Sequence, residues 1–373
     1  MQPLENIRVL DLSRVLAAPT GTMLLGDLGA EVIRIEHPEG SDSMREWGPF
    51  VNGQSTYYLS ANRNKKSITL DLKLESEREK FKKLVSDADI IIENFKTGDM
   101  KKLGLHYEEL QKVNPRIIHV AVTGFGQTGP LASEPGFDPV IQAMSGLMDV
   151  TGAIDGEPTR VGIPIADILT SHYVVIGVLA ALRQRDLTGN GQFIDLSLFD
   201  VQLSSMANVT SAYLNAGYVS KRLGNQHNNI APYQVFKCKD GLIMICAGTE
   251  LQFIKLCMLL NKPEWVQDER FKTNVLRKNH ENLLAEMINE ITVTKNRDEW
   301  LQLLHDYKIP GGQVLTVAEA LEHPQTKARH LIGEVEHPVY GTVKFIKNPL
   351  QYSELNIQYK YAPPILGEHN DSL

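Results

Sequence analysis

The sequence predicts an α/β fold, with a doubly wound parallel sheet in a large domain that is followed by a smaller α+β domain. Two features lead to this prediction. Short runs rich in Ile and Val alternate with segments of helical spacing through the first third of the chain. The pattern changes after residues 222–233, a stretch rich in Gly, Asn and Pro that is typical of a boundary. A chain of 373 residues is long enough for two such domains.

The alternation in the first body has a clear order. Strand-like runs cover residues 7–13, 31–36, 67–72, 89–95, 116–125 and 191–200. Segments with helical spacing cover residues 18–30, 75–88, 107–114 and 166–185. Because each helical crossover brings the chain back to the same end of the sheet, the strands are expected to be parallel, with helices on both faces.

Three segments follow from this pattern. Residues 1–224 are predicted to form the large domain, and residues 225–330 the small one. The small domain should contain a hairpin at 233–248 that turns at Lys239–Gly241, and amphipathic helices after it. Residues 331–373 lack an apolar core of their own and are expected to pack back on the large domain.

Composition excludes several classes of function. A net charge of −7 argues against nonspecific nucleic-acid binding. The longest uncharged apolar run has about ten residues, whereas a membrane-spanning helix needs roughly 20, so no membrane association is expected. The chain enters a strand-like pattern at once, without a leader, which predicts a cytoplasmic protein. Cys238, Cys246 and Cys257 have no zinc-ligand spacing, and no metal site is predicted.

Common catalytic signatures are missing from the sequence. "DLSRVLAAPTGT" stands after the first strand, where a dinucleotide-binding protein has GxGxxG. There is no P-loop and no HExxH, and the segment around Ser145 has Ala143 where a nucleophile elbow needs glycine. NAD binding, metal hydrolysis and serine-triad chemistry are therefore disfavoured.

Asp167 is the acid that stands out. It lies in the apolar stretch "GIPIADILTSHY" and precedes the uncharged run 173–182. Aspartate is a favoured N-cap, so a structural role at the start of helix 166–185 is predicted. The helix N-terminus should also favour the ionised carboxylate. A partly desolvated carboxylate can act as a nucleophile toward an activated carbonyl such as a thioester, so the two roles are compatible.

Three further segments suggest an anionic ligand. The glycine-rich loop 120–130 directly follows a strand, at the edge where α/β folds bind ligands, and indicates close backbone approach. The basic clusters 62–67 and 94–102 lie beside strand ends. Each cluster is also compatible with a solvated surface. If both flanked the same sheet edge, they would suit a phosphorylated ligand.

Taken together, these segments resemble the class III CoA-transferases, the family that includes formyl-CoA transferase and carnitine CoA-transferase. The resemblance extends over essentially the whole chain and rests on several independent stretches in the family's order. They are "IRVLDLSRVLAAPTGTMLLGDLGAEVIRIEHP", "NRNKKSITLDLK", "DIIIENF", "TGFGQTGP", "GFDPVIQAMSG", "IADI", "TGNGQFIDLSL" and "APYQVFKCKDG".

The resemblance implies a homodimer of interlocked rings, each with a Rossmann-like large domain and a small domain. It places the family's nucleophilic aspartate on Asp167, which would form an aspartyl–acyl anhydride and then an aspartyl–CoA thioester. The substrates would be an acyl-CoA and a small carboxylic acid, without a prosthetic group. The implied CoA contacts are Leu16, Ala17, His37, Leu70, Asp71, Leu72, Lys73, Asn94, Phe95, Lys102, Phe137 and Asp138.

Two departures from the family are visible. The family commonly has Arg at the positions of His37 and Lys102, and neither of these residues offers a bidentate fork to a phosphate. The family's mobile glycine-rich lid corresponds to residues 247–253, which contain one glycine, so a less mobile lid is expected.

Several functions compete within this resemblance. The α-methylacyl-CoA racemases need a His where Phe137 stands, and Phe cannot exchange a proton. A CoA carrier without chemistry and transferases of the formyl-CoA:oxalate or carnitine type are further alternatives. Segments 48–68 and 232–241 look most like the succinyl-CoA:glutarate branch. Such a branch needs a partner for a distal carboxylate, and the candidates are Arg14, Arg45, Asn225, His227, Asn228 and Asn229.

Overall fold

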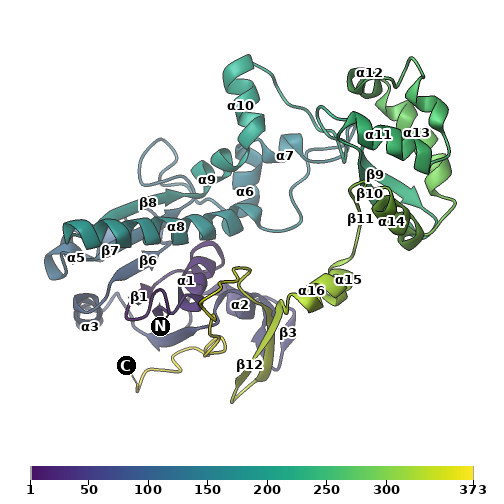
Figure 1. Cartoon of the computed structure of the whole chain (residues 1–373). Coiled ribbons are helices and arrows are strands. Elements are labelled where there is room, and N and C mark those ends of the chain that lie inside the picture. The colour runs from purple at the N-terminus through teal and green to yellow at the C-terminus, as the bar shows by residue number, and fades with distance from the viewer. Residues whose placement is uncertain (1, 373) are drawn as a thin grey trace. The chain divides into compact units, whose positions relative to one another are not determined.

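The computed structural model describes residues 2–372 (Figure 1). The chain forms two compact units, which are described separately. Unit 1 comprises Met1–Met148, Arg160–Ser220 and Lys327–Leu373, and unit 2 comprises Asp149–Thr159 and Lys221–Thr326. The short helices α7 (Leu147–Val150) and α16 (Pro324–Ala328) contain two of the boundaries between them.

Unit 1 is built on a six-stranded parallel sheet with the order β5-β2-β1-β6-β7-β8. The chain starts in the middle, adds strands to one edge, and then returns to add strands at the other. Neighbouring strands β1 and β6 therefore form a topological switch point, where α/β folds bind ligands. The strands are β1 (Arg8–Asp11), β2 (Glu31–Glu36), β5 (Lys65–Thr69), β6 (Ile90–Glu93), β7 (Ile118–Thr123) and β8 (Phe193–Ser197).

Helices cover both faces of this sheet, which confirms the predicted α/β fold. Along β6, Ile90 and Ile92 face one helix layer while Ile91 faces the other, because successive strand residues point to opposite faces. One layer contains α1 (Ala17–Asp27) and α8 (Ile165–Thr188). The other contains α3 (Glu75–Ser86), α4 (Asp99–Lys102) and α5 (Tyr107–Val113).

Three more helices belong to the ligand-binding end of unit 1. They are α6 (Asp138–Met144), α9 (Leu198–Ser205) and α10 (Ala207–Ala216). The sequence pattern predicts a strand through residue 200, but β8 ends at Ser197. The Ser197 hydroxyl accepts the Asp200 N–H at 3.2 Å and caps α9, which starts the helix there.

Helix α8 is long and apolar enough, by length and composition alone, to cross a membrane, and within residues 2–372 it is the one helix that meets this criterion. It packs lengthwise against α1, β7 and β8, and the side chains of Val174 and Val178 are fully buried there. Burial against the sheet and α1 accounts for one apolar side of the helix, while Ile176 and Leu187 are among the apolar side chains that it exposes.

The C-terminal segment belongs to unit 1. Its hairpin pairs β12 (Ile332–His337) with β13 (Gly341–Ile346), and Tyr340 and Val343 pack with Leu59. Leu59 lies in α2 (Thr56–Ala61), which follows a small hairpin and a 3₁₀ turn. The remaining elements of this region are η1 (Ser43–Glu46), β3 (Phe50–Val51) and β4 (Gln54–Ser55).

Unit 2 has its own core around a three-stranded sheet of order β11-β10-β9. The predicted hairpin is confirmed, since Cys238 pairs with Gly241 across the turn. The strands are β9 (Tyr233–Cys238), β10 (Gly241–Cys246) and β11 (Gly311–Gln313). The helices are α11 (Glu250–Leu259), η2 (Pro263–Val266), α12 (Asn274–Asn279), α13 (Glu281–Thr292), α14 (Arg297–Asp306) and α15 (Val317–Glu322).

The basic cluster 62–67 does not have the predicted ligand-binding position. Strand β5 begins at Lys65, two residues earlier than expected, so the last residues of the cluster belong to the strand. The cluster lies at the amino end of β5, away from the carboxyl ends where the cavities open. Lys65 is fully buried, and its Nζ lies 3.0 Å from Asp11 Oδ2. Arg63 binds Asp27, and Lys66 binds Glu31. These cations are neutralised inside the protein, because a buried charge needs a partner.

Candidate functional site

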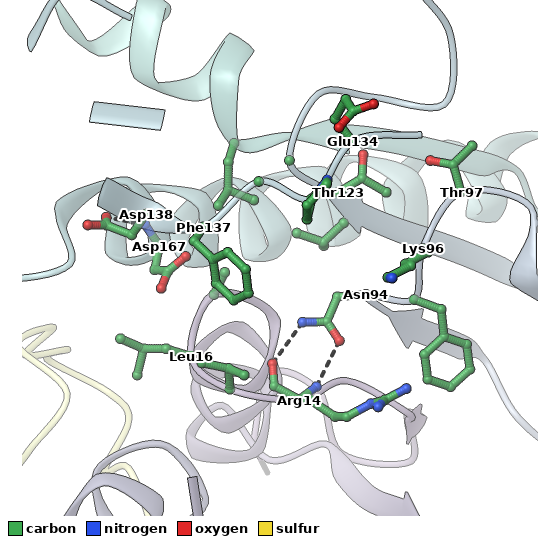
Figure 2. A pocket seen from close by; sticks show the side chains of 18 of the residues that line it. Arg14, Leu16, Asn94, Lys96, Thr97, Thr123, Glu134, Phe137, Asp138 and Asp167 are labelled. Carbon is green, nitrogen blue, oxygen red and sulfur yellow. Dashed lines mark hydrogen bonds between the residues drawn. The ribbon is translucent and has the colours of Figure 1, made fainter. Parts of the chain in front are cut away.

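Asp167 lines a cavity of about 510 Å³ at the carboxyl ends of β1, β6 and β7 in unit 1. The first wall is the β1–α1 loop with Arg14, Leu16 and Ala17, and the second is the segment that follows β6. Phe137 and Asp138 at the start of α6 complete the wall beside Asp167 (Figure 2). The cavity therefore opens at the switch point of the sheet, as the ligand site of a doubly wound fold does.

A second cavity of about 540 Å³ shares Arg14, Phe95 and Asp99 with the first. It contains the other residues that the family resemblance assigned to CoA, namely His37, Leu70, Asp71, Leu72, Lys73 and Lys102. All twelve predicted CoA contacts thus line two connected cavities in unit 1, although they come from six separate segments of the chain. Their roles as ligands stay a prediction.

The charges of the second cavity are mixed. His37 Nε2 lies 3.6 Å from Asp71 Oδ1, and Lys102 Nζ lies 2.7 Å from Asp99 Oδ1 in an exposed pair. Exposed ion pairs of this kind contribute little stability and are easily exchanged for a phosphate partner. Of the two basic clusters considered above, only 94–102 lies at the ligand-binding edge.

The β1–α1 loop has an unusual backbone conformation. Val15 has φ of +64°, a region that β-branched residues rarely adopt. The neighbouring Arg14 is held on both sides by Asn94, whose Oδ1 accepts its N–H at 2.8 Å and whose Nδ2 donates to its carbonyl at 2.7 Å (Figure 2). Strain that is held by specific bonds is typical of a functional loop. Spacing in the sequence carries no signal for this conformation.

The glycines of loop 120–130 have a structural explanation. A Cβ on Gly124 would lie 2.4 Å from the Cα of Gly136, so the predicted close backbone approach is to another segment of the protein. This contact brings the loop after β7 against the segment that leads into α6. Thr123 and Gly124 line the cavity of Asp167 as a consequence.

The prediction that Asp167 caps its helix is wrong. Helix α8 begins at Ile165, and its N-cap residue, Pro164, has no side-chain hydrogen bond. The cap comes from α6, where Asp138 Oδ1 accepts the N–H of Ala166 at 2.8 Å and that of Asp167 at 3.4 Å. Proline at the N-cap cannot accept a bond through its side chain, which leaves the free N–H groups to a neighbouring element.

The expectation that the helix N-terminus favours the ionised Asp167 carboxylate is wrong as well. Burial, and after it the negative charge of Asp138, raise the pKa of Asp167 to about 7. Within residues 2–372 the half-buried Asp167 carboxylate makes no hydrogen bond, since Asp138 takes the helix N–H groups that would have stabilised its charge. A raised pKa with a clear physical cause, inside a cavity, marks Asp167 as a candidate catalytic group.

The surroundings of Phe137 and Arg45 bear on two questions, whether a second base lies beside Asp167 and which arginine is free to bind a ligand. Phe137 is 66% exposed and lines the cavity of Asp167, where its ring offers no group that exchanges protons. Arg45 is not a free cation, because Glu36 binds its guanidinium at 2.9 and 2.7 Å and the Tyr58 hydroxyl lies 2.7 Å away. Arg14 therefore remains the arginine candidate in this cavity.

Arg14 extends over the ring of Phe95, with 4.9 Å between the guanidinium carbon and the ring centroid. In the described part of the chain, no carboxylate lies within ion-pair distance of it. An unpaired arginine in a cavity can bind a carboxylate or a phosphate. Across residues 2–372 no cluster of His, Cys, Asp and Glu could hold a metal ion.

Comparison with known proteins places the chain in a known family. Residues 4–370 match the model of CoA-transferase family III. Succinyl-CoA:glutarate CoA-transferase of Mus musculus is 40% identical over 99% of this chain and 85% of its own length. Succinate–glutarate CoA-transferase of Agrobacterium fabrum is 40% identical over 98% and 94%, and acetyl-CoA:oxalate CoA-transferase of Acetobacter aceti is 41% identical over 94% and 89%.

The solved structures agree with this match. A CAIB/BAIF family protein from Brucella suis superposes with a TM-score of 0.91 at 41% sequence identity. The superposition covers 99% of this chain and 97% of that one.

Proposed function

The chain belongs to CoA-transferase family III and is an enzyme that transfers CoA, and we propose that it moves CoA from succinyl-CoA to glutarate through covalent intermediates on Asp167. The observation that carries the proposal is the carboxylate itself. Asp167 lies in a cavity at the switch point of the sheet, without a hydrogen-bond partner in residues 2–372, and its pKa is raised to about 7. A partly desolvated carboxylate with a raised pKa is a good nucleophile toward a thioester.

The transfer then takes four balanced steps. An Asp167 oxygen attacks the carbonyl carbon of succinyl-CoA, the C–S bond breaks, and the CoA thiolate leaves with its electron pair. The thiolate attacks the aspartyl carbonyl of the resulting anhydride and releases succinate. Glutarate attacks the aspartyl–CoA thioester and releases the thiolate again. The thiolate finally attacks the glutaryl carbonyl, which forms glutaryl-CoA and restores the Asp167 carboxylate.

The two connected cavities suit the two ends of CoA. We place the nucleotide in the cavity of His37, Lys73 and Lys102, and the thioester in the cavity of Asp167. Cationic side chains then lie with the phosphates. Racemisation is disfavoured, because it needs two bases on opposite faces of the α-carbon and Phe137 cannot act as one.

A dicarboxylate acceptor is supported by the relatives and by Arg14. Glutarate and oxalate, which the relatives' names give as acceptors, are both dicarboxylic acids. Succinyl-CoA carries a distal carboxylate too, so donor and acceptor pose the same problem of binding a second charge. We assign that carboxylate to Arg14, which lines the cavity and has no carboxylate partner in residues 2–372.

A donor and acceptor screen tests the proposed substrates. Succinyl-CoA, acetyl-CoA and formyl-CoA are each assayed with a panel of free carboxylic acids, and product acyl-CoA is measured by mass spectrometry. Succinyl-CoA with glutarate is expected to have the highest kcat/KM. A clear preference for formyl-CoA or acetyl-CoA with oxalate would move the chain to another branch of the family.

We also propose that the enzyme is a homodimer of interlocked chains, as the family resemblance implies. Helices α8 and α10 support this, because they expose large apolar side chains, namely Tyr173, Ile176, Leu179, Leu187, Tyr213 and Leu214. Exposed apolar surface of this extent is typical of an interface. Light scattering should give the dimer mass at every protein concentration under native conditions, since interlocked rings separate only on unfolding. A monomer that appears on dilution contradicts interlocking.

A further inference from the structure

Asp138 is tied to the start of α8 by a short buried network. Its side chain is 6% exposed, and its Oδ2 accepts a hydrogen bond from Gln142 Nε2 at 2.6 Å. Gln142 is fully buried, and its Oε1 accepts the N–H of Val161 at 2.9 Å. Together with the bonds from Asp138 Oδ1 to Ala166 and Asp167, this network fastens the chain on both sides of the turn into α8.

The network also places two carboxylates at the start of one helix. Besides Asp167, the charged side chains that line the cavity are Arg14, Lys96, Asp99, Glu134 and Asp138. Of these five, Asp138 is the one whose charge raises the pKa of Asp167. The elements packed against α8 are α1, α6, α9, β7 and β8. Their further titratable groups are Asp27, His119, Asp195 and Asp200, and none of these lines the cavity.

We propose that Asp138 is a positioning residue of the transfer reaction, which fixes the start of α8 and holds a second negative charge against the attacking carboxylate. The inference rests on the proposed role of Asp167 as the nucleophile. It adds a function for an acid that the family resemblance placed only among the CoA contacts. Both oxygens of Asp138 are engaged within the protein, Oδ1 by the backbone at the helix start and Oδ2 by the side chain of Gln142.

The physical consequence concerns the acylation step. Ionised Asp167 is repelled by Asp138 and has lost the helix N–H groups that would have solvated it. When its oxygen attacks the thioester, the negative charge passes to the CoA sulfur and the acylated Asp167 is neutral. The repulsion is then relieved, so Asp138 favours acylation over the resting carboxylate.

A pair of substitutions separates charge from hydrogen bonding. In Asp138→Asn, the amide oxygen can still accept from Ala166, but the amide nitrogen faces Gln142 Nε2, so two donors meet. Adding Gln142→Glu restores an acceptor for that amide and keeps one for the N–H of Val161. The double variant therefore keeps the hydrogen bonds and the net charge, and moves the negative charge one side chain away from Asp167.

The test measures kcat/KM against pH, which reports groups of the free enzyme, and thermal unfolding of the same variants. In the wild type the rate should fall as pH drops through about 7, since the ionised Asp167 is the nucleophile. Asp138→Asn should lower this midpoint by about one pH unit and lower Tm. The double variant should regain the wild-type Tm while its midpoint stays low. Asp186→Asn, at the far end of α8, should leave both unchanged.

Two results would overturn the inference. If the double variant regains both the Tm and the wild-type midpoint of the pH profile, Asp138 acts only as a cap of α8. The assignment of Asp167 as the nucleophile then still stands, provided that hydroxylamine traps an acyl group on Asp167. If the wild type itself gives no trapped Asp167, the proposed mechanism fails, and the role of Asp138 fails with it. Should Asp138→Asn not fold, the double variant alone decides the matter, because its hydrogen bonds are complete.

Discussion

Asp167→Ala is expected to reduce kcat by about a thousandfold or more, a loss of roughly 4 kcal/mol in transition-state stabilisation. The covalent route cannot begin without this carboxylate, and no other carboxylate of the cavity is available at the same place, since Asp138 is held by the helix start. Folding should be nearly unchanged. The Asp167 side chain makes no hydrogen bond within residues 2–372, and its removal relieves a repulsion.

The covalent adduct gives a direct readout of this prediction. After incubation with succinyl-CoA, hydroxylamine should convert Asp167 into a hydroxamate, and peptide mass spectrometry should locate it on the segment that contains this residue. Asp186→Ala, an exposed acid of the same helix, serves as the matched control and should keep full activity and labelling. Near-normal turnover of Asp167→Ala, with CoA binding intact, would remove Asp167 from the mechanism.

Glutarate should exceed butyrate by about a hundredfold in kcat/KM, because a site built for a polar group is left with an unpaired charge when the ligand lacks that group. Of the two arginine candidates for the distal carboxylate, the structure favours Arg14, since Arg45 is bound by Glu36 and Tyr58. Arg14→Gln should therefore lower the efficiency with glutarate and leave butyrate nearly unchanged. The ratio of the two acids should approach unity.

A ratio is the useful measurement here, because Arg14 lines both cavities and its loss can weaken acyl-CoA binding as well. A general loss lowers both acids equally and cancels in the ratio. Arg329→Gln, at an exposed position of unit 1 outside both cavities and outside α8, is the control for removing a surface charge. If wild-type enzyme uses butyrate and glutarate equally well, the dicarboxylate assignment is wrong, while the transfer mechanism through Asp167 is unaffected.

Much of the site could be predicted because its residues lie in segments with a strong local pattern. Asp167 stands alone in an apolar stretch, and Leu16, Asn94 and Phe137 each follow or border a recognisable strand or helix. The carboxyl ends of parallel strands meet at one edge of the sheet, so such residues converge even when they are far apart in the chain. The structure brings all the predicted CoA contacts to that edge in two connected cavities.

The basic cluster 62–67 is a feature whose role could not be predicted from the sequence pattern. Its charges look available in the sequence, yet Arg63, Lys65 and Lys66 each bind a carboxylate from another element. The cluster runs into the amino end of β5, whereas the ligand-binding cavities lie at the carboxyl ends of the parallel strands. Pattern alone does not assign charges to partners, because the partners are distant in sequence.

By itself, the sequence determined the alternating strands and helices, the parallel sheet and the prominence of Asp167, because periodicity and burial are local properties of the chain. Tertiary structure decided how that acid is held. The cap of α8 comes from Asp138, 29 residues before Asp167, and leaves the Asp167 carboxylate without hydrogen-bond donors in the described chain. The raised pKa of Asp167 follows from burial and from a neighbouring charge, and both exist only once α6 and α8 are packed together.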